Sequence, residues 1–507
     1  MRMRRAVGEM HNRAENLVCR GSHGARNLAR SGESGLPSPS ARPHPPHHKS
    51  LMSLATPAAE PASQAPSAQR RGLLRVLGVT FGLAVIIGNT IGAGILRTPG
   101  QVAQQLPGTG LYLAVWIGGG VYALLGALSL AELGTMLPRS GGMYVFARHA
   151  LGRYAGFLVG WNDWAATCGT VAAVAVVLAE YAGALVPGLA GRTVPLAMAV
   201  TVAFAALQWR GIREAGAAQT LTSAAKALVL LALVGACFLL PRVSPPSAAA
   251  AAAVPAGSAL LAAIVVALQG VIYTYDGWTG VIYFSGEVRD PARDIPRSMI
   301  GGVLAVTGIY LLLNLAFLHV VPIAALAGEP LAAAAAARAV LGPAGDTVVR
   351  VVLIVALLST VNALLLMAPR VLYAMSADGL FPRAGASVNR GGTPTGALVA
   401  STAVALAFIA TGTFNAIIAV LAFFFVANYV LAFASVFVLR RREPETPRPY
   451  RAWGYPWTTG LAIAGSLAFL AGAAASDTRN SLYAAGLLAA SYPAYLLAAR
   501  WIDRNPT

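Results

Sequence analysis

The sequence predicts an all-α polytopic membrane protein with twelve transmembrane helices, and three observations lead to this fold class. Of its 507 residues, 57% are hydrophobic and only 11% are charged. The mean hydropathy of +0.64 is too high for a soluble domain. From Leu73 to residue 501 one apolar run follows another, most of them near the length of about 20 residues that crosses a bilayer.

The predicted helices begin and end where the apolar runs do. Two of them, 194–210 and 395–411, are short for a span, and the run Leu331–Leu341 is too short to cross and is placed on the outer face. The helices are expected near residues 74–104, 110–137, 153–186, 194–210, 213–240, 257–287, 297–322, 346–376, 395–411, 414–440, 457–475 and 481–501.

Residues 1–72 are predicted to be a disordered, basic tail rich in Pro, Ser and His. The histidine-rich run 42–48 could bind a metal weakly, but a flexible tail is the favoured interpretation. No signal-peptide pattern is present, and Met52 is an alternative start that would make residues 1–51 an upstream extension. Residues 502–507 are expected to be a short cytoplasmic tail.

The arginines of the apolar part predict its orientation. With Arg70 and Arg71 just before the first helix included, twenty-one arginines fall on one set of alternate connections and six on the other. The positive-inside rule therefore places both termini in the cytoplasm. The chain itself is expected in the cytoplasmic (inner) membrane. The net charge of +18 does not indicate nucleic acid binding, because the arginines bracket apolar runs and form no stripe among aromatic residues.

The sequence offers little support for a metal-binding protein or a membrane enzyme. Cys19, Cys168 and Cys237 have no C-x-x-C spacing, so neither a metal nor a cofactor is expected. A membrane enzyme would need a clustered nucleophile and base or a set of metal ligands. His149 and His319 are the only histidines after residue 72 and lie far apart in sequence.

The first apolar run contains glycines at 88, 92 and 94, each of which costs roughly 1 kcal/mol relative to alanine inside a helix. Either these glycines let another helix pack closely, or the helix breaks here and exposes backbone groups to a ligand. Unpaired backbone is tolerated at membrane depth only where protein covers it or it lines a watery cavity.

A second interruption favours the break. In the sixth helix the apolar run is interrupted by Tyr273-Thr274-Tyr275-Asp276-Gly277-Trp278-Thr279-Gly280. The two interrupted helices, the first and the sixth, are separated by four intact ones. This spacing indicates two inverted five-helix repeats, 73–240 and 257–440, with helices 11 and 12 at 457–501 and a ligand bound between the breaks near the membrane midplane.

Lys226 is the only lysine after residue 49. It lies thirteen residues after Arg213, which is about 20 Å along a helix, so neither membrane surface is within easy reach. An ionisable residue at this depth usually marks an ion or substrate pathway; the alternative is a lysine that bonds backbone carbonyls for structure alone. Glu132 is expected to pair with a loop arginine, and Asp163 and Glu180 are interpreted as structural.

Four groups of residues resemble the amino acid–polyamine–organocation (APC) permeases, and within them the bacterial relatives of the L-type amino acid transporters. They cover helices 1 to 8 in order, and the resemblance extends over about 73–501. The groups are Gly92-Ala93-Gly94-Ile95 with Thr98-Pro99; Ala131-Glu132-Leu133-Gly134 through Pro138 to Gly141-Gly142; Tyr275-Asp276-Gly277-Trp278 with Gly286-Glu287-Val288 and Asp290-Pro291; and Pro369-Arg370-Val371-Leu372-Tyr373-Ala374-Met375 through Asp378-Gly379.

The resemblance implies the leucine-transporter fold and a substrate site at the two breaks. Backbone amides around Ala93, Gly94 and Ile95 would hold a carboxylate at the positive end of a helix. Carbonyls near Thr90, Ile91 and Tyr273 would accept from an ammonium, and Tyr273 would cover the substrate from outside. The remaining predicted substrate-site residues are Gly92, Tyr275, Asp276, Gly277 and Trp278; Asp276 and Trp278 either contact the ligand or brace the break.

Two further sets of residues complete the predicted site. Lys226, with Ser359 and Thr360 of the eighth helix around it, is expected to replace the cation that related sodium-coupled carriers bind. Asn362, Phe424 and Asn428 are expected in the side-chain pocket. The family often has serine at position 93 and phenylalanine at 273, whereas this chain has alanine and tyrosine, which leaves the substrate preference open.

The resemblance implies a secondary transporter rather than an enzyme, without cofactor. Its substrates are expected to be amino acids, in particular neutral L-amino acids, moved by alternating access through sodium-independent exchange or proton symport. A carrier of polyamines or other organic cations with the same fold is the alternative, and a channel is a third class. The expected partners are the small-molecule substrate and the lipid bilayer, with no nucleic acid and no obligatory partner chain.

Overall fold

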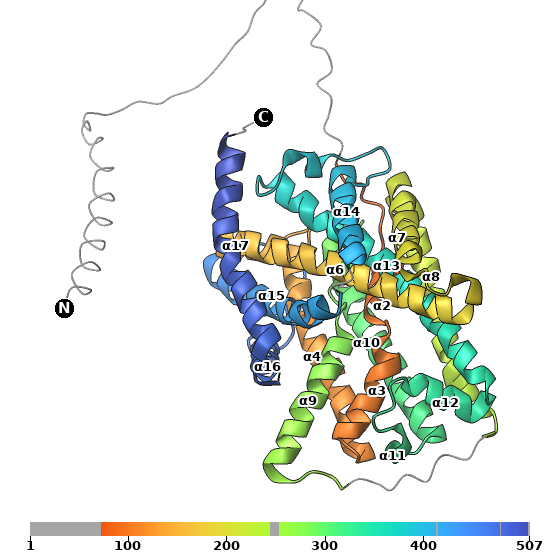
Figure 1. Ribbon diagram of the computed structural model, residues 1–507. Helices are drawn as coiled ribbons and strands as arrows, with labels where there is room; N and C mark the ends of the chain where they lie inside the picture. The colour runs from red at the N-terminus through yellow and green to blue at the C-terminus, as the bar shows by residue number, and fades with distance from the viewer. Residues whose placement is uncertain (1–71, 244–252, 412–413, 477, 505–507) are drawn as a thin grey trace, which may run out of the picture. The chain divides into compact units, whose positions relative to one another are not determined.

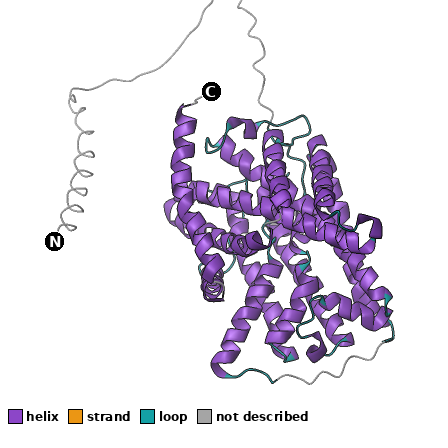
Figure 2. Ribbon diagram, viewed as in Figure 1, coloured by secondary structure: helices purple, strands orange, loops and turns teal. Residues whose placement is uncertain are grey.

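The computed structural model describes residues 72–243, 253–411, 414–476 and 478–504. Except for Gly72, the predicted tail 1–72 lies outside the described residues, as do residues 505–507 of the predicted C-terminal tail. The described part is built of helices, and its only strand-like pairings are the isolated bridges Leu77–Val288 and Val388–Pro394. Figure 2 shows this all-helical architecture, which confirms the predicted fold class.

The helices follow the predicted order, with short additional elements between them. The α-helices are α2 (Val79–Thr90), α3 (Gly94–Gln105), α4 (Thr109–Met136), α5 (Met143–Leu151), α6 (Arg153–Leu185), α7 (Thr193–Arg210), α8 (Ile212–Leu239), α9 (Gly257–Tyr275), α10 (Pro291–Val320), α11 (Ile323–Leu326), α12 (Ala332–Leu341), α13 (Ala344–Ala377), α14 (Thr395–Thr411), α15 (Phe414–Arg442), α16 (Trp457–Ser476) and α17 (Thr478–Arg504). Three 3-10 helices join them: η1 (Pro187–Leu189), η2 (Gly280–Phe284) and η3 (Arg383–Ala386).

The predicted count of twelve spans is not confirmed. Within the described residues, nine helices are long and apolar enough to cross a membrane, and the bent pair α2 and α3 makes a tenth. The helix α14 has only 17 residues, and α17 is less apolar and contains Pro493. The ten-residue α12 corresponds to the run that was predicted to be too short to span.

Both predicted helix breaks are present. The helix α2 ends at Thr90, and α3 begins at Gly94 after a bend of 48°. The helix α9 ends at Tyr275, and η2 begins five residues later at Gly280. The chain therefore leaves the helical path at the two positions where glycine and polar residues interrupt the apolar runs.

The broken helices lie inside a bundle of intact ones. The helix α2 packs against α8, α10 and α13, while α9 packs against α3 and α4. The long helix α6 crosses the bundle and packs against α13, α14 and α15 (Figure 1). This arrangement places the ends of α2 and α9 close to each other in the interior.

A network of buried polar contacts closes the end of the bundle that the charge pattern assigns to the cytoplasm. Leu77, just before α2, pairs with Val288, and the amide of Arg289 donates to the carbonyl oxygen of Leu77 at 2.8 Å. Beside this bridge, Arg370 of α13 forms a salt bridge of 3.0 Å with Glu287. Arg370 is buried, because Glu287 offers it a carboxylate partner.

Glu132 forms a second ionic contact at the same end. Its carboxylate lies 2.6 Å from Arg440, at the end of α15, and 3.2 Å from Arg448 in the following loop. It also accepts a hydrogen bond from the backbone amide of Ala452 at 2.6 Å. The predicted pairing of Glu132 with a loop arginine is therefore confirmed.

Candidate functional site

A cavity of about 460 Å³ lies between the two helix breaks. Its wall includes residues from α3, α6, α13 and α15 as well as the breaks themselves. Of the residues predicted for the site from sequence, those on the wall are Thr90, Gly92, Ala93, Gly94, Tyr273, Asp276, Gly277 and Thr360. The wall also includes exposed Arg97 and Gln101 of α3, so the cavity is accessible from that side.

The beginning of α3 offers backbone donors to the cavity. Ala93 precedes the helix and provides no side-chain cap, so no side chain at this position satisfies the first N–H groups of α3. Gly92, Ala93 and Gly94 all line the cavity. Free N–H groups and the positive end of a helix dipole together favour an anion such as a carboxylate.

The carbonyl groups at the two breaks accept hydrogen bonds from protein groups, which the sequence did not predict. The hydroxyl of Tyr310 lies 2.9 Å from the carbonyl oxygens of both Thr90 and Thr274. The carbonyl oxygen of Ile91 accepts from Lys226, and that of Tyr273 accepts from the amide of Asp276. The three carbonyls predicted to receive a substrate ammonium therefore already have protein partners.

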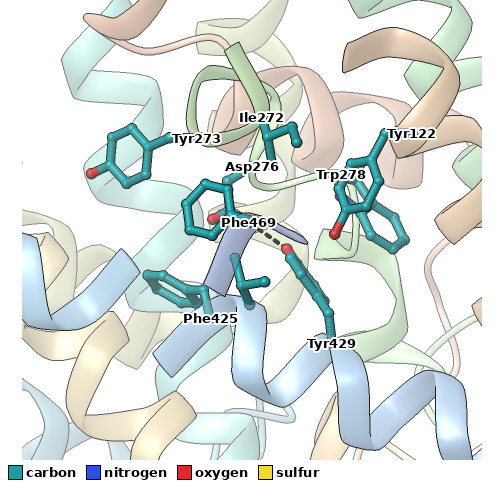
Figure 3. A pocket seen from close by; sticks show the side chains of 9 residues that line it. Tyr122, Ile272, Tyr273, Asp276, Trp278, Phe425, Tyr429 and Phe469 are labelled. Atoms are coloured by element: carbon teal, nitrogen blue, oxygen red, sulfur yellow. Dashed lines mark hydrogen bonds between the residues drawn. The ribbon is translucent and has the colours of Figure 1, made fainter. Parts of the chain in front are cut away.

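Gly277 brings the second break against the first. Its φ of +112° favours glycine, and a Cβ atom there would lie 2.8 Å from the amide nitrogen of Thr90. The preceding residue, Asp276, has an extended backbone and accepts a hydrogen bond from the hydroxyl of Tyr429 of α15. Figure 3 shows this contact beneath the end of α9. Asp276 thus lines the cavity and also braces the break.

Trp278 braces the break without lining the cavity. Its indole is buried and stacks on Tyr429, with ring centroids 5.2 Å apart, and lies nearly parallel to Phe433. Tyr275 is also buried and donates to the carbonyl oxygen of Trp116 at 3.1 Å. Tyr273 differs from both, because 44% of it is exposed and it lies on the cavity wall.

Four residues of the predicted substrate site are therefore absent from the wall. Ile91 and Ile95 are fully buried in the hydrophobic core, and Tyr275 and Trp278 pack away from the cavity. The backbone at Ile91 nevertheless shapes the site, because its carbonyl oxygen is bonded to Lys226. Proximity in sequence to a break does not by itself place a side chain at the cavity.

Lys226 of α8 is 1% exposed and reaches the end of α2. Its ammonium donates to the carbonyl oxygen of Gly88 at 2.8 Å, to that of Ile91 at 2.5 Å, and to the hydroxyl of Thr360 at 3.1 Å. An ammonium has three donors, so all of them are used. Thr360 also donates to Gly88, so α2, α8 and α13 meet at this lysine.

Ser359 does not contact Lys226, in contrast to the prediction. Its hydroxyl lies 3.0 Å from that of Ser223 and 3.3 Å from the amide nitrogen of Gln219. Neighbouring positions on a helix point about 100° apart. Ser359 therefore faces α8 at Ser223 and Gln219, about one and two turns before Lys226, whereas Thr360 faces Lys226 itself.

The three pocket residues predicted from sequence do not line the cavity. Asn362 is buried and donates to Gln219 of α8 at 2.8 Å. Phe424 packs in a small cluster with Ala166 and Ala484, and Asn428 is buried away from the wall. Phe425 and Tyr429, each one residue further along α15, line the cavity instead. The prediction for α15 therefore chose the wrong face of the helix.

Sequence reasoning also missed several residues on the wall. Arg97 and Thr98 lie one turn after Gly94, so the helical period of α3 could have identified them. Tyr283, of η2, gives no such signal because it follows an irregular segment. Arg97 and Asp276 are the charged residues on the described wall.

Comparison with known proteins identifies the family to which this site belongs. A model of the amino acid permease family matches residues 72–491. The chain belongs to the amino acid permease family. This membership confirms the family predicted from the sequence motifs, and with it a membrane permease that is not an enzyme.

Three relatives illustrate the family. The chain is 30% identical to the serine/threonine exchanger SteT of Bacillus subtilis, over 81% of this chain and 93% of the relative. It is 27% identical to the human b(0,+)-type amino acid transporter 1, over 77% of this chain and 81% of the relative. It is 28% identical to the rat large neutral amino acids transporter small subunit 2, over 75% and 72%. These relatives support amino acid transport as the general activity of this permease.

Proposed function

We propose that this permease transports neutral L-amino acids by alternating access, without sodium, and works as a single chain. The observation that carries the proposal is the cavity between the two breaks, where the uncapped start of α3 faces the polar end of α9. An amino acid presents a carboxylate and an ammonium to the same small volume. Amides of α3 would hold the carboxylate, and Asp276 would receive the ammonium.

The described conformation represents the outward-facing stage of this cycle. The end that carries the Glu287–Arg370 salt bridge is closed, whereas Tyr273 is half exposed at the other side of the cavity. Substrate would enter past Arg97, and Tyr273 would then cover it. Opening of the Glu287–Arg370 end would release the substrate to the cytoplasm. We also propose that both termini are cytoplasmic and that the chain lies in the inner membrane. The repeats would be 73–240 and 257–440, followed by two helices at 457–501.

A carrier of polyamines is the alternative function of the same fold. A polyamine would need several acceptors for its charges, but the charged residues on the described wall are one acid, Asp276, and one base, Arg97. Asp276 already accepts from Tyr429. This pair of opposite charges suits a zwitterion better than a polycation.

A ligand panel on purified protein tests the substrate class. Any ligand that binds only the folded state raises the apparent melting temperature. We expect L-serine, L-threonine and larger neutral L-amino acids to raise it in a saturable manner, and D-serine and putrescine to have no effect. Stabilisation by putrescine without stabilisation by any amino acid would favour the polyamine carrier.

Transport is expected to proceed at full rate without sodium. The Lys226 ammonium occupies the oxygens of Gly88, Ile91 and Thr360, which are hard oxygen ligands of the kind that a sodium ion would need. A second cation there would be repelled by the first. Uptake into proteoliposomes with sodium replaced by choline or potassium measures this, and a strict requirement for sodium would disprove it.

Arg97→Gln is expected to raise the apparent KM for a neutral amino acid about threefold and to leave the maximal rate nearly unchanged. A unit charge acting across about 7 Å of water contributes about 0.6 kcal/mol, or roughly threefold. The effect should disappear at high salt, because screening removes it. Arg192→Gln is the matched control, since Arg192 is exposed before α7 and does not line the cavity. Equal KM values for the two variants at low salt would refute a role for Arg97.

A further inference from the structure

Asp163 is a buried acid that the proposed substrate site does not use. It lies on α6, a membrane-spanning helix, and is 0% exposed. In the part of the chain that the structure describes, no arginine, lysine or histidine forms a salt bridge with it; its carboxylate contact is with Tyr283 of η2. The Tyr283 hydroxyl lies 2.8 Å and 2.9 Å from the two carboxylate oxygens.

Tyr283 connects this acid to the cavity. Its side chain is part of the cavity wall, whereas Asp163 is not. The hydroxyl of Tyr283 therefore links the carboxylate of Asp163 to the cavity wall. A single tyrosine can accept a proton on one side of its oxygen and donate its own on the other.

The other ionisable groups near α6 do not neutralise Asp163. Asp276, at the end of α9, is a further acid close enough to Asp163 to add negative charge there. Tyr144 of α5 contacts α6 at Gly160, one turn earlier, but donates its hydroxyl to Asp378 at 3.0 Å. Two other ionisable groups on helices that pack against α6 have partners of their own: Arg370 of α13 pairs with Glu287, and Tyr429 of α15 donates to Asp276. The remaining ones contact α6 farther from Asp163: Arg148 of α5 lies beside Gly156, and Tyr492 and Tyr495 of α17 pack against Tyr154.

An isolated carboxylate in this place is costly when it is charged. Burial of a charge without a paired opposite charge is expensive, and such groups neutralise instead. One hydroxyl donor offsets only part of that cost. By contrast, the buried Lys226 has an acceptor for each of its three donors. Ionisable residues inside a membrane bundle mark ion or proton pathways.

We propose that Asp163 is the proton-binding residue that couples amino acid transport to a proton gradient, with Tyr283 as the relay between Asp163 and the cavity. The proposal rests on the proposed transport function and selects proton symport over pure exchange. Asp163 touches neither substrate nor cavity, so it acts through Tyr283.

The proton transfer is balanced at named atoms. A hydronium ion in the cavity gives a proton to the Tyr283 hydroxyl oxygen, and the original Tyr283 O–H bond breaks as its proton forms an O–H bond on Asp163. Tyr283 is neutral before and after, Asp163 changes from carboxylate to carboxylic acid, and the hydronium ion becomes water. The reverse sequence returns the proton when the cavity faces the cytoplasm.

The same tyrosine links this proton to the closed end of the bundle. The amide of Gly141 donates to the carbonyl oxygen of Tyr283 at 3.1 Å, and the ring of Tyr283 packs against Gly142. The neighbouring Ser140 donates to Glu287 at 3.2 Å, which is the partner of Arg370. Protonation of Asp163 would therefore change the hydrogen bond that positions η2 directly above the Glu287–Arg370 contact.

The test uses the full chain in proteoliposomes with the membrane potential clamped and labelled L-serine as the probe. A pH difference of one unit, alkaline inside, corresponds to roughly tenfold accumulation for one proton per substrate. Wild-type protein should approach this value. Asp163→Asn keeps an oxygen acceptor for Tyr283 but cannot ionise, so accumulation should fall to onefold while exchange of internal for external serine continues. Tyr283→Phe should slow the response to the gradient.

Glu180→Gln is the matched control, because Glu180 is an exposed acid on the same helix; it should accumulate serine as the wild type does. Asp163→Asn that still accumulates serine tenfold would overturn the proposal and leave Asp163 as a brace for η2. Wild-type protein that exchanges serine but ignores the pH gradient would overturn it too, while the transport function stands. Wild-type protein that moves no amino acid would refute both.

Discussion

Lys226→Ala is expected to reduce transport by more than about 30-fold while the protein still inserts into the membrane. The substitution removes three hydrogen bonds that join α8 to the end of α2 and to Thr360. The loss of even one charge-assisted hydrogen bond, at about 2 kcal/mol, changes the population of the competent state roughly 30-fold. Serine uptake and the fraction of detergent-soluble monodisperse protein together measure the effect.

Lys226→Arg should not restore transport. The guanidinium is planar and larger than an ammonium, so it cannot place donors on Gly88, Ile91 and Thr360 in the same geometry. Ser223→Ala is the control for packing of α8 on α2, since Ser223 donates to Ala84 at 2.7 Å without any charge; it should lose no more than a few-fold. Normal uptake by Lys226→Ala would show that the lysine has only a structural role.

Gly94→Val is expected to abolish substrate binding. A Cβ atom at this position already lies 3.1 Å and 3.2 Å from the side chain of Thr274, and a valine adds two methyl groups at the start of α3. These methyl groups would occupy the space in which a carboxylate approaches the amides of α3. The ligand-induced rise in melting temperature with L-serine should disappear, with a loss of more than about 100-fold in affinity, which is roughly 2.7 kcal/mol.

Two control variants separate this effect from a general cost of valine in a helix. Gly235→Val places the same residue in α8, where a Cβ atom meets nothing within 4 Å, and it should bind serine normally. Gly94→Ala adds a single methyl group and should retain part of the affinity. If Gly94→Val bound serine with unchanged affinity, the break between α2 and α3 would be a packing motif rather than the carboxylate site.

The two breaks and the buried lysine could be predicted from sequence because each violates a local rule. Glycines 92 and 94, the Asp276-Gly277 pair and Lys226 are all costly inside an apolar helix, so their positions stand out without any tertiary information. For the same reason, the sequence could predict that Glu132 pairs with an arginine. The resemblance to the APC permeases then assigned these positions to one substrate site.

Side-chain directions could not be predicted in the same way. The helix α15 is apolar on most of its surface, so no hydrophobic period indicates which side faces the cavity. The sequence therefore does not distinguish Phe424 from Phe425, which lines the wall. Ser359 and Thr360 are equally polar, and only the position of α13 beside α2 decides which one reaches Lys226. The engagement of the Thr90 carbonyl by Tyr310 depends on a contact across 220 residues.

The most direct test of the central claim is uptake of labelled L-serine into sodium-free proteoliposomes that contain the purified protein. The claim is that an amino acid binds between the two breaks and is carried by alternating access. It predicts uptake that saturates with external serine, rises when unlabelled serine is loaded inside, and is lost in Gly94→Val but retained in Gly235→Val. Uptake that increases linearly with concentration, without stimulation by internal serine, would indicate a channel and would contradict the account.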